Sequence, residues 1–213
     1  MDKNQIELSD RIKIGFISLV SMFLLYIGIG QFASTQSHIS LITDLDKVIP
    51  FHIDWIWIYL SYLPLLCITF LLASKENLFY SITIGLILNV MIASFFFAFF
   101  PSTYPRPLVE CIDYTTCALY FTQKIDPPWN TFPSLHVALS WFIALSFKRE
   151  GELKYRFFTT WAFLISLSTL FLKQHYLIDV FAAYALARFI RWIMIIVFFI
   201  KDYIDHSTNK FTP

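Results

Sequence analysis

Three uncharged apolar stretches dominate the chain and restrict what it can fold into. They cover residues 14–32, 55–73 and 78–100. A helix that crosses the hydrocarbon core of a bilayer needs ~20 consecutive apolar residues, and each stretch is close to that length. A soluble domain needs far more charge to cover its surface than this chain has, with 15% charged and 57% hydrophobic residues. The sequence therefore predicts an integral membrane protein.

Three further apolar stretches complete the expected helix set. Residues 132–147 and 157–172 are shorter, and residues 176–200 form a long stretch that contains Arg188 and Arg191. Strand-like alternation is absent, so we expect an all-α polytopic protein with a bundle of six transmembrane helices. The two arginines are expected either to reach the inner interface with their side chains or to line a polar interior.

The remaining composition bounds the domain count and the class of partner. We expect one membrane-embedded domain over residues 1–213, with a core of about 12–200, because both tails are short. The stretch at 14–32 is too long for a removable signal peptide and lacks a small-residue cleavage site. The net charge of +1 and the absence of a basic patch exclude nucleic acid as the expected partner.

The basic residues predict the orientation in the membrane. Lys and Arg accumulate in loops that stay in the cytoplasm, and with six helices both termini share one side. That side collects Lys3, Arg11, Lys13, Lys75, Lys148, Arg149, Lys154, Arg156, Lys201 and Lys210, against Lys47, Arg106, Lys124 and Lys173 on the other. We therefore expect cytoplasmic termini in a plasma (bacterial inner) membrane. An aromatic belt at the outer interface would consist of Trp55, Trp57, Tyr59 and Tyr62.

Three polar clusters then fall at the outward ends of different helices. They are "PSTYPRP" at 101–107, "NTFPSLHVAL" at 130–139 and "KQHYLID" at 173–179. They are far apart in sequence, but the expected topology places all three at one membrane level. We expect the active site at this face.

The second cluster has the features of an anion site. Pro133 suits the first turn of a helix, where a missing N–H costs nothing. The amides of Ser134, Leu135 and His136 would then lack intrahelical partners, and the positive helix end favours an anion such as phosphate. His136 would be close enough to exchange a proton with that anion. The segment taken alone fits equally well a capped helix with an interfacial histidine.

The third cluster adds a candidate nucleophile. His175 and Asp179 are four residues apart, so on a helix they share a face. The carboxylate would accept one imidazole N–H and leave the other nitrogen free as nucleophile or base. A structural hydrogen bond is the alternative reading of this pair. Two histidines, a carboxylate, Arg106 and an anion-binding helix start on one side indicate phosphoryl transfer through a phosphohistidine.

These residues resemble the type 2 phosphatidic acid phosphatase superfamily of membrane lipid phosphate phosphatases. That family carries the motifs K-x6-R-P, P-S-G-H and S-R-x5-H-x3-D within a six-helix core. This chain has "RP" at Arg106–Pro107, "PSLH" at Pro133–His136 and "ST-x5-H-x3-D" at Ser168–Asp179, in the same order. The stretch "QHYLIDVFAAY" is also similar to the branch that contains inositol phosphorylceramide and sphingomyelin synthases.

The resemblance implies a role for each matched residue. His175 would attack phosphorus and Asp179 would orient it. His136 would protonate the leaving alkoxide and later activate water. The phosphate oxygens would be held by Arg106, by Ser134 and by the amides at the helix start, including that of Leu135.

The chain departs from the family pattern at three positions. Phe99 and Thr169 stand where the family has Lys and Arg, and Leu135 replaces the motif glycine. Fixed cations stabilise the charge of a phosphoryl group in transfer, so we expect a second cation beside Arg106. Lys173, two residues before His175, is the candidate for the second cation. The alternative is a lysine that marks the membrane boundary.

Three functions remain open from the sequence. The first is a lipid phosphate phosphatase that needs neither cofactor nor metal and acts on the outer face, with a lipid phosphate and the bilayer as its partners and no obligatory protein partner. The second is a head-group transferase of the inositol phosphorylceramide or sphingomyelin synthase type. The third is a non-catalytic lipid-binding pseudoenzyme. The sequence does not identify the lipid.

The three cysteines differ in context. Cys111 and Cys117 lie in an outer loop, where an oxidising compartment permits a disulfide, although the sequence does not decide whether it forms. Cys67 lies within an apolar stretch, and we expect it to be a buried free thiol.

Overall fold

The structure is a computed structural model that describes residues 5–126 and 128–208. Within those ranges the chain is mostly helical, and no β-strand is present in them. The α-helices are α1 (Leu8–Ser34), α2 (Asp44–Val48), α3 (Ile56–Leu60), α4 (Tyr62–Leu72), α5 (Glu76–Phe99), α6 (Tyr114–Ile125), α7 (Leu135–Ser146), α8 (Glu152–Phe171) and α9 (Leu177–Thr208). Two 3₁₀ turns cover Ile53–Trp55 and Phe147–Arg149. The all-α fold is therefore confirmed.

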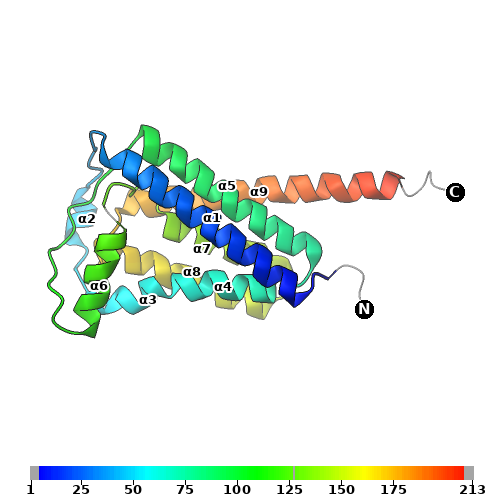
Figure 1. The fold of residues 1–213 in the computed structure, drawn as a ribbon, viewed down its shortest axis with the longest axis horizontal. Coiled ribbons are helices and arrows are strands. Elements are labelled where there is room, and N and C mark those ends of the chain that lie inside the picture. The colour runs from blue at the N-terminus through cyan, green and yellow to red at the C-terminus, as the bar shows by residue number, and fades with distance from the viewer. Residues whose placement is uncertain (1–4, 127, 209–213) are drawn as a thin grey trace.

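The long helices lie side by side in an elongated bundle, as Figure 1 shows. The short helices α2 and α6 cover one end, and the start of α1 and the end of α9 lie at the opposite end. Helix α7 is the inner element and packs against α5, α8 and α9. Most of its side chains are buried, including Leu139, Phe142 and Ile143. The end covered by α2 and α6 is called the capped end below.

Four helical stretches are long and apolar enough to cross a membrane: Leu8–Ser34, Ile53–Leu72, Glu76–Phe99 and Leu177–Lys201. They coincide with four of the six predicted spans. The other two predicted spans correspond to α7, which has 12 residues, and α8, which has 20. At 1.5 Å per residue α7 is roughly 18 Å long, and it is enclosed by its neighbours. The count of six spans stays a prediction.

The second span is interrupted, and the sequence explains where. Helix α3 ends at Leu60, and α4 starts at Tyr62. Pro64 has no N–H to donate to the carbonyl of Leu60, so a continuous helix would lose that bond. Starting a new helix at Tyr62 places Pro64 in a first turn, where N–H groups have no intrahelical partner anyway.

Two expectations about side-chain placement are wrong. Cys67 is free, as expected, but it is exposed on α4 and not buried. Tyr59 and Tyr62 do not join an outer belt, because both rings pack against His136 inside the capped end. The surface of a membrane helix is as apolar as its interior, so hydropathy does not show which face of α3 or α4 points inward.

The two arginines of α9 behave differently from each other. Arg191 turns into the bundle, where Nε donates to the carbonyl of Leu145 at 3.3 Å and Nη1 lies 3.4 Å from Ser81 Oγ. Arg188 is exposed. Arg191 therefore matches the polar-interior reading, and Arg188 does not.

Loop segments at the capped end are tied to one another by backbone hydrogen bonds. The N–H of Thr103 donates to the carbonyl of Ile39 at 3.0 Å, and the N–H of Thr131 donates to the carbonyl of Ser102 at 3.4 Å. The hydroxyls of Ser102 and Thr131 lie 2.6 Å apart. These bonds fix the segment before α7 against the loops that follow α1 and α5.

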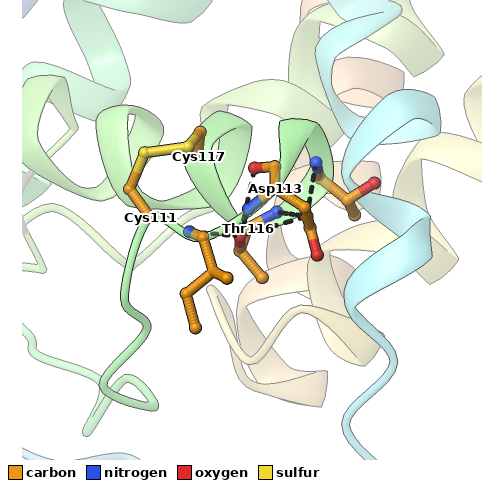
Figure 2. Close-up of a disulfide and its surroundings, with 6 residues drawn as sticks. Cys111, Asp113, Thr116 and Cys117 are labelled. Carbon is orange, nitrogen blue, oxygen red and sulfur yellow. Dashed lines mark hydrogen bonds between the residues drawn. A yellow bond between two sulfur atoms is a disulfide. The ribbon is translucent and has the colours of Figure 1, made fainter.

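A disulfide closes the turn that leads into α6. Cys111 and Cys117 are bonded, with their Cα atoms 4.1 Å apart, as Figure 2 shows. The disulfide that the sequence permits is therefore present. Between the two cysteines, Asp113 caps α6 and accepts hydrogen bonds from the amides of Thr115 and Thr116. The bridge and the cap together set the direction of α6, which carries Asp126 at its end.

Candidate active site

A tight turn after α8 presents His175. Lys173 has a positive φ of 54°, which lets the chain reverse directly after the helix. The amides of Gln174 and His175 both point back to the carbonyl of Thr169, at 2.9 Å and 3.3 Å. His175 is thus held at the capped end just before α9 begins.

The imidazole of His175 has two acceptors on the same nitrogen. Nδ1 lies 2.8 Å from the carbonyl oxygen of Thr131 and 3.4 Å from Oδ2 of Asp179. A carbonyl oxygen only accepts, so Nδ1 carries the proton and Nε2 keeps its lone pair. The expected Asp179 partner is present, but the shorter bond goes to Thr131, which the sequence did not reveal.

Asp179 joins the starts of two helices. Its Oδ2 accepts from the amide of Tyr176 at 2.9 Å, and its backbone carbonyl accepts from the amide of Ser134 at 3.3 Å. The side chain is fully buried, and Oδ1 has no hydrogen-bond partner among the described residues. Asp179 therefore aligns the start of α9 with the start of α7.

The start of α7 differs in one respect from the prediction. The helix begins at Leu135 with Ser134 as the N-cap, so Pro133 lies just outside the helix and not in its first turn. The Ser134 hydroxyl is buried and is without a hydrogen-bond partner in the described part of the chain. The first-turn amides of Leu135 and His136 lie at the positive end of the helix. The sequence left the amide of Ser134 free as well, but this amide donates to the carbonyl of Asp179. Anion binding at this helix start stays a prediction.

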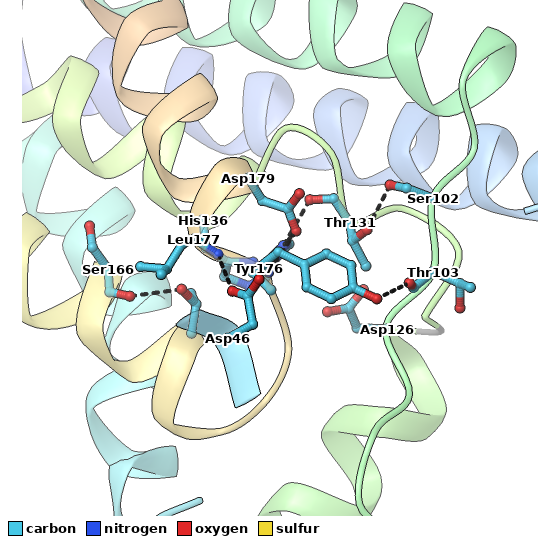
Figure 3. Close-up of polar contacts among 12 residues, drawn as sticks. Asp46, Ser102, Thr103, Asp126, Thr131, His136, Ser166, Tyr176, Leu177 and Asp179 are labelled. Atoms are coloured by element: carbon cyan, nitrogen blue, oxygen red, sulfur yellow. Dashed lines mark hydrogen bonds and ion pairs between the residues drawn. The ribbon is translucent and has the colours of Figure 1, made fainter. Parts of the chain in front are cut away.

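The second histidine of the site lies close to the first. The ring centroids of His136 and His175 are 6.3 Å apart. The rings of Tyr59 and Tyr62 pack on His136 at centroid distances of 4.4 Å and 4.7 Å. The Tyr59 hydroxyl lies 3.3 Å from Nδ1 of His136. Figure 3 shows His136 and Asp179 gathered with Thr131 and Asp126.

Arg106 reaches this site together with a carboxylate that the sequence reading missed. Its Nη2 lies 3.7 Å from Oδ2 of Asp126, and its Nη1 donates to the Asp126 carbonyl. The hydroxyls of Tyr26 and Tyr59 also donate to this carboxylate, from Tyr59 at 3.0 Å. Burial alone would raise the pKa of Asp126, but the Arg106 guanidinium and the hydrogen bonds hold this pKa below its ordinary value. Asp126 is therefore ionised at neutral pH.

Lys173 does not have the surroundings expected of a phosphate ligand. Its ammonium donates to the carbonyl of Asp46 at 2.9 Å and to the carbonyl of Ile49. Burial lowers the pKa of Lys173, with Asp46 acting in the opposite sense. The Asp46 carboxylate also accepts from the amide of Leu177 at 2.8 Å. Lys173 and Asp46 thus connect α2 to the start of α9, and the phosphate role of Lys173 stays a prediction.

The positions where the family pattern is broken are structurally ordinary. Phe99 is 67% exposed at the end of α5. Thr169 is buried, and its hydroxyl donates to the carbonyl of Ser166 at 2.8 Å. Neither residue substitutes for a cation. Of the predicted set, the structure brings together His136, His175, Asp179, Arg106, Ser134 and Leu135 at the capped end.

Residues 34–193 identify the class to which this fold and site belong. A buried helix start and two neighbouring histidines lie at one end of an apolar helical bundle. A model of the PAP2 superfamily matches residues 34–193, which is more than half of the chain. The chain belongs to the PAP2 superfamily.

Two individual proteins are similar to this chain. The uncharacterized protein MJ0662 of Methanocaldococcus jannaschii is 39% identical over 62 residues, which make up 29% of this chain and 26% of that protein. The matched segment thus spans about a quarter of that relative. The crystal structure of Aquifex aeolicus LpxE is similar with a TM-score of 0.49 and 19% identity, over 73% of this chain and 88% of that chain.

Proposed function

We propose that the protein is a lipid phosphate phosphatase that hydrolyses a phosphomonoester or diphosphate lipid through a phosphohistidine. The observation that carries the proposal is the His175–His136 pair, 6.3 Å apart, beside the unpartnered Ser134 hydroxyl at the start of α7. Membership of the PAP2 superfamily supports the same chemistry. The four apolar helices supply the bilayer setting that a lipid substrate requires.

In the first half of the reaction His175 acts as the nucleophile. With Nδ1 protonated and bound to Thr131, the lone pair of Nε2 forms the N–P bond while the bond from phosphorus to the lipid oxygen breaks. The departing alkoxide takes a proton from the imidazolium of His136. Asp179 stabilises the positive charge that develops on His175.

In the second half of the reaction water replaces the lipid alkoxide. Neutral His136 accepts a proton from a water molecule, whose oxygen attacks phosphorus as the N–P bond breaks. The products are inorganic phosphate and the original His175. The equatorial oxygens would be held by the first-turn amides of α7, including that of Leu135, by the Ser134 hydroxyl and by Arg106.

The proposal is tested with purified protein and a panel of lipid phosphates that includes phosphatidic acid and a diphosphate lipid. We expect the parent to release inorganic phosphate, His175→Ala to release none, and His136→Ala to lose about 10²–10⁴ in kcat. Retained turnover by the His175 variant would refute the mechanism. A second arm adds an alcohol acceptor, because a lipid product that carries the phosphoryl group would identify a transferase instead.

The location of the reaction is also part of the proposal. We place the capped end on the outer face of the plasma membrane, with both termini in the cytoplasm, since the basic residues concentrate at the opposite end. Lys3 and Lys210, which belong to that distribution, lie outside the described residues. The mechanism uses only side chains and backbone amides of this chain, and we propose that it needs no metal. Turnover unchanged by a chelator would agree with this.

A further inference from the structure

The direction of two hydrogen bonds assigns the proton on His136. The Tyr59 hydroxyl has one proton, and its contact with Oδ2 of Asp126, at 3.0 Å, uses that proton because an ionised carboxylate only accepts. The contact between the same hydroxyl and Nδ1 of His136, at 3.3 Å, then requires Nδ1–H as the donor. His136 therefore has Nδ1 protonated, and Nε2 is the nitrogen that exchanges a proton.

Three elements hold Asp126 in the position that this chain of bonds needs. Tyr26 on α1 donates to Oδ1, Tyr59 on α3 donates to Oδ2, and Arg106 binds the Asp126 carbonyl and lies beside the carboxylate. A buried carboxylate with this many donors is fixed in place and stays ionised. Tyr59 also contacts His136, through its ring and through its hydroxyl.

We propose that Tyr59 and Asp126 are positioning residues for His136: the hydroxyl fixes the imidazole with Nδ1–H, and the carboxylate stabilises the imidazolium through that hydroxyl. This inference rests on the function proposed above, in which His136 is the acid and base. Without the Tyr59 hydroxyl, the aromatic ring at position 59 would still pack on His136, but the imidazole of His136 would be free to change tautomer. The imidazolium would also lose its hydrogen-bonded connection to the Asp126 carboxylate.

The charged and titratable groups that face His136 come from several elements. They are Tyr59 from α3, Tyr62 from α4, Arg106 from the loop after α5, Asp126 from the end of α6, and His175 before α9. Burial lowers the pKa of His136, and the positive charges of Arg106 and a protonated His175 act in the same direction, whereas Asp126 raises this pKa. The hydrogen bonds from Asp126 through Tyr59 to His136 therefore affect the pH up to which His136 stays protonated and can act as an acid.

The matched pair of variants is Tyr59→Phe and Tyr62→Phe. Both tyrosine rings pack on His136, but the Tyr62 hydroxyl makes no hydrogen bond within the described residues. Each variant keeps its ring and loses one hydroxyl. A difference between them therefore isolates the Tyr59 hydrogen bonds from ring packing, and thermal unfolding of both variants checks the fold.

The readout compares leaving groups by kcat/KM, which reports the steps up to departure of the leaving group. We expect Tyr59→Phe to lower kcat/KM for an alkyl phosphate about 10- to 100-fold, the effect of one hydrogen bond to a charged group. For 4-nitrophenyl phosphate, whose leaving group needs no proton, we expect less than about threefold. The alkaline limb of the alkyl phosphate profile should move to lower pH. Tyr62→Phe should change none of these by more than about threefold.

Two further measurements decide the outcome. Asp126→Asn should reproduce the leaving-group pattern, and the double variant with Tyr59→Phe should be no slower than the slower single variant, since both break one chain. Higher activity of Asp126→Asn, or equal losses in Tyr59→Phe and Tyr62→Phe, would overturn the inference.

¹⁵N NMR of histidine-labelled protein, with His136→Gln for assignment, tests the inference without turnover. A parent with no phosphatase activity but with Nδ1–H on His136 would remove the proposed function alone, whereas Nε2–H would remove this inference.

Discussion

The Nδ1–H of His175 has two acceptors, the backbone carbonyl of Thr131 and the carboxylate of Asp179. The presence of the carbonyl reduces the loss of kcat that we expect from a substitution of Asp179. In catalytic triads where a single Asp orients the histidine, Asp→Asn costs about 10⁴ in kcat because the wrong tautomer forms. Here the carbonyl of Thr131, at 2.8 Å, maintains the tautomer without Asp179.

We therefore expect Asp179→Asn to lower kcat by about 10²-fold or less, while His175→Ala abolishes turnover. The remaining loss reflects the missing negative charge near the developing imidazolium. Steady-state kinetics on the best lipid phosphate measures the effect, and thermal unfolding serves as the control. A loss of 10⁴-fold in a folded variant would mean that the Thr131 contact does not fix the tautomer.

The sequence identified the residues that are proposed to react, but not the residues that contact them. His136, His175 and Asp179 could be found because their types and spacing are local. Tyr59 and Asp126 are 67 positions apart, and neither belongs to a recognisable motif. Nothing in one sequence shows that the end of α6 returns to α3, so this part of the site required the fold.

Lys173 shows that spacing along the sequence does not identify the partners of a side chain. The position of Lys173, two residues before the proposed nucleophile, suggested a phosphate ligand. Its ammonium instead binds carbonyl oxygens at α2, a helix that the sequence analysis did not predict. Helix α6 was not predicted either. Short amphipathic helices give a weak signal beside long apolar stretches.

We expect Lys173→Met to lower the free energy of unfolding by about 1–3 kcal/mol, the range for buried groups left without a hydrogen-bond partner. Since the site itself keeps its ligands, kcat/KM should fall less than tenfold. Thermal unfolding in detergent and kinetics on one lipid phosphate measure the two quantities. A loss of about 10²-fold at unchanged stability would instead support the phosphate role predicted from the sequence.

The disulfide should stabilise the element that carries Asp126. Closing a loop of about seven residues is worth about 2 kcal/mol by the chain-entropy estimate. The double variant Cys111→Ser/Cys117→Ser should unfold at a lower temperature than the parent, and a reductant should lower the melting temperature of the parent but not of the variant. Cys67→Ser is the control because Cys67 is free. Equal sensitivity of parent and variant to reductant would contradict this assignment.

At the scale of the whole molecule, the separation of the two ends allows a direct test of orientation. The background is Cys67→Ala, which leaves only the bonded pair. Leu45→Cys lies on α2 at the capped end, and Leu153→Cys lies near the start of α8; both positions are exposed. In intact cells we expect an impermeant thiol reagent to label the first and spare the second. The reverse pattern would place the active site in the cytoplasm.

The hydropathy of the chain predicted the bundle well because lipid-facing helices must be apolar along their whole length. It predicted less well which faces meet, as Tyr59, Tyr62 and Cys67 show. It also counted the shorter stretch 132–147 as a span, and α7 within this stretch is a short helix enclosed by its neighbours. Burial by protein and burial by lipid give the same composition, so only the packing separates them.

The order of the site residues along the chain has a consequence for biosynthesis. A ribosome delivers Tyr26 and Tyr59 early, the start of α7 later, and His175 just before the last long helix. A nascent or truncated product that stops before residue 175 thus has the helix start proposed to bind phosphate but no nucleophile. Such a product also lacks the carbonyl of Asp179, to which the amide of Ser134 donates, so we expect the site to be complete only after the start of α9 has been synthesised.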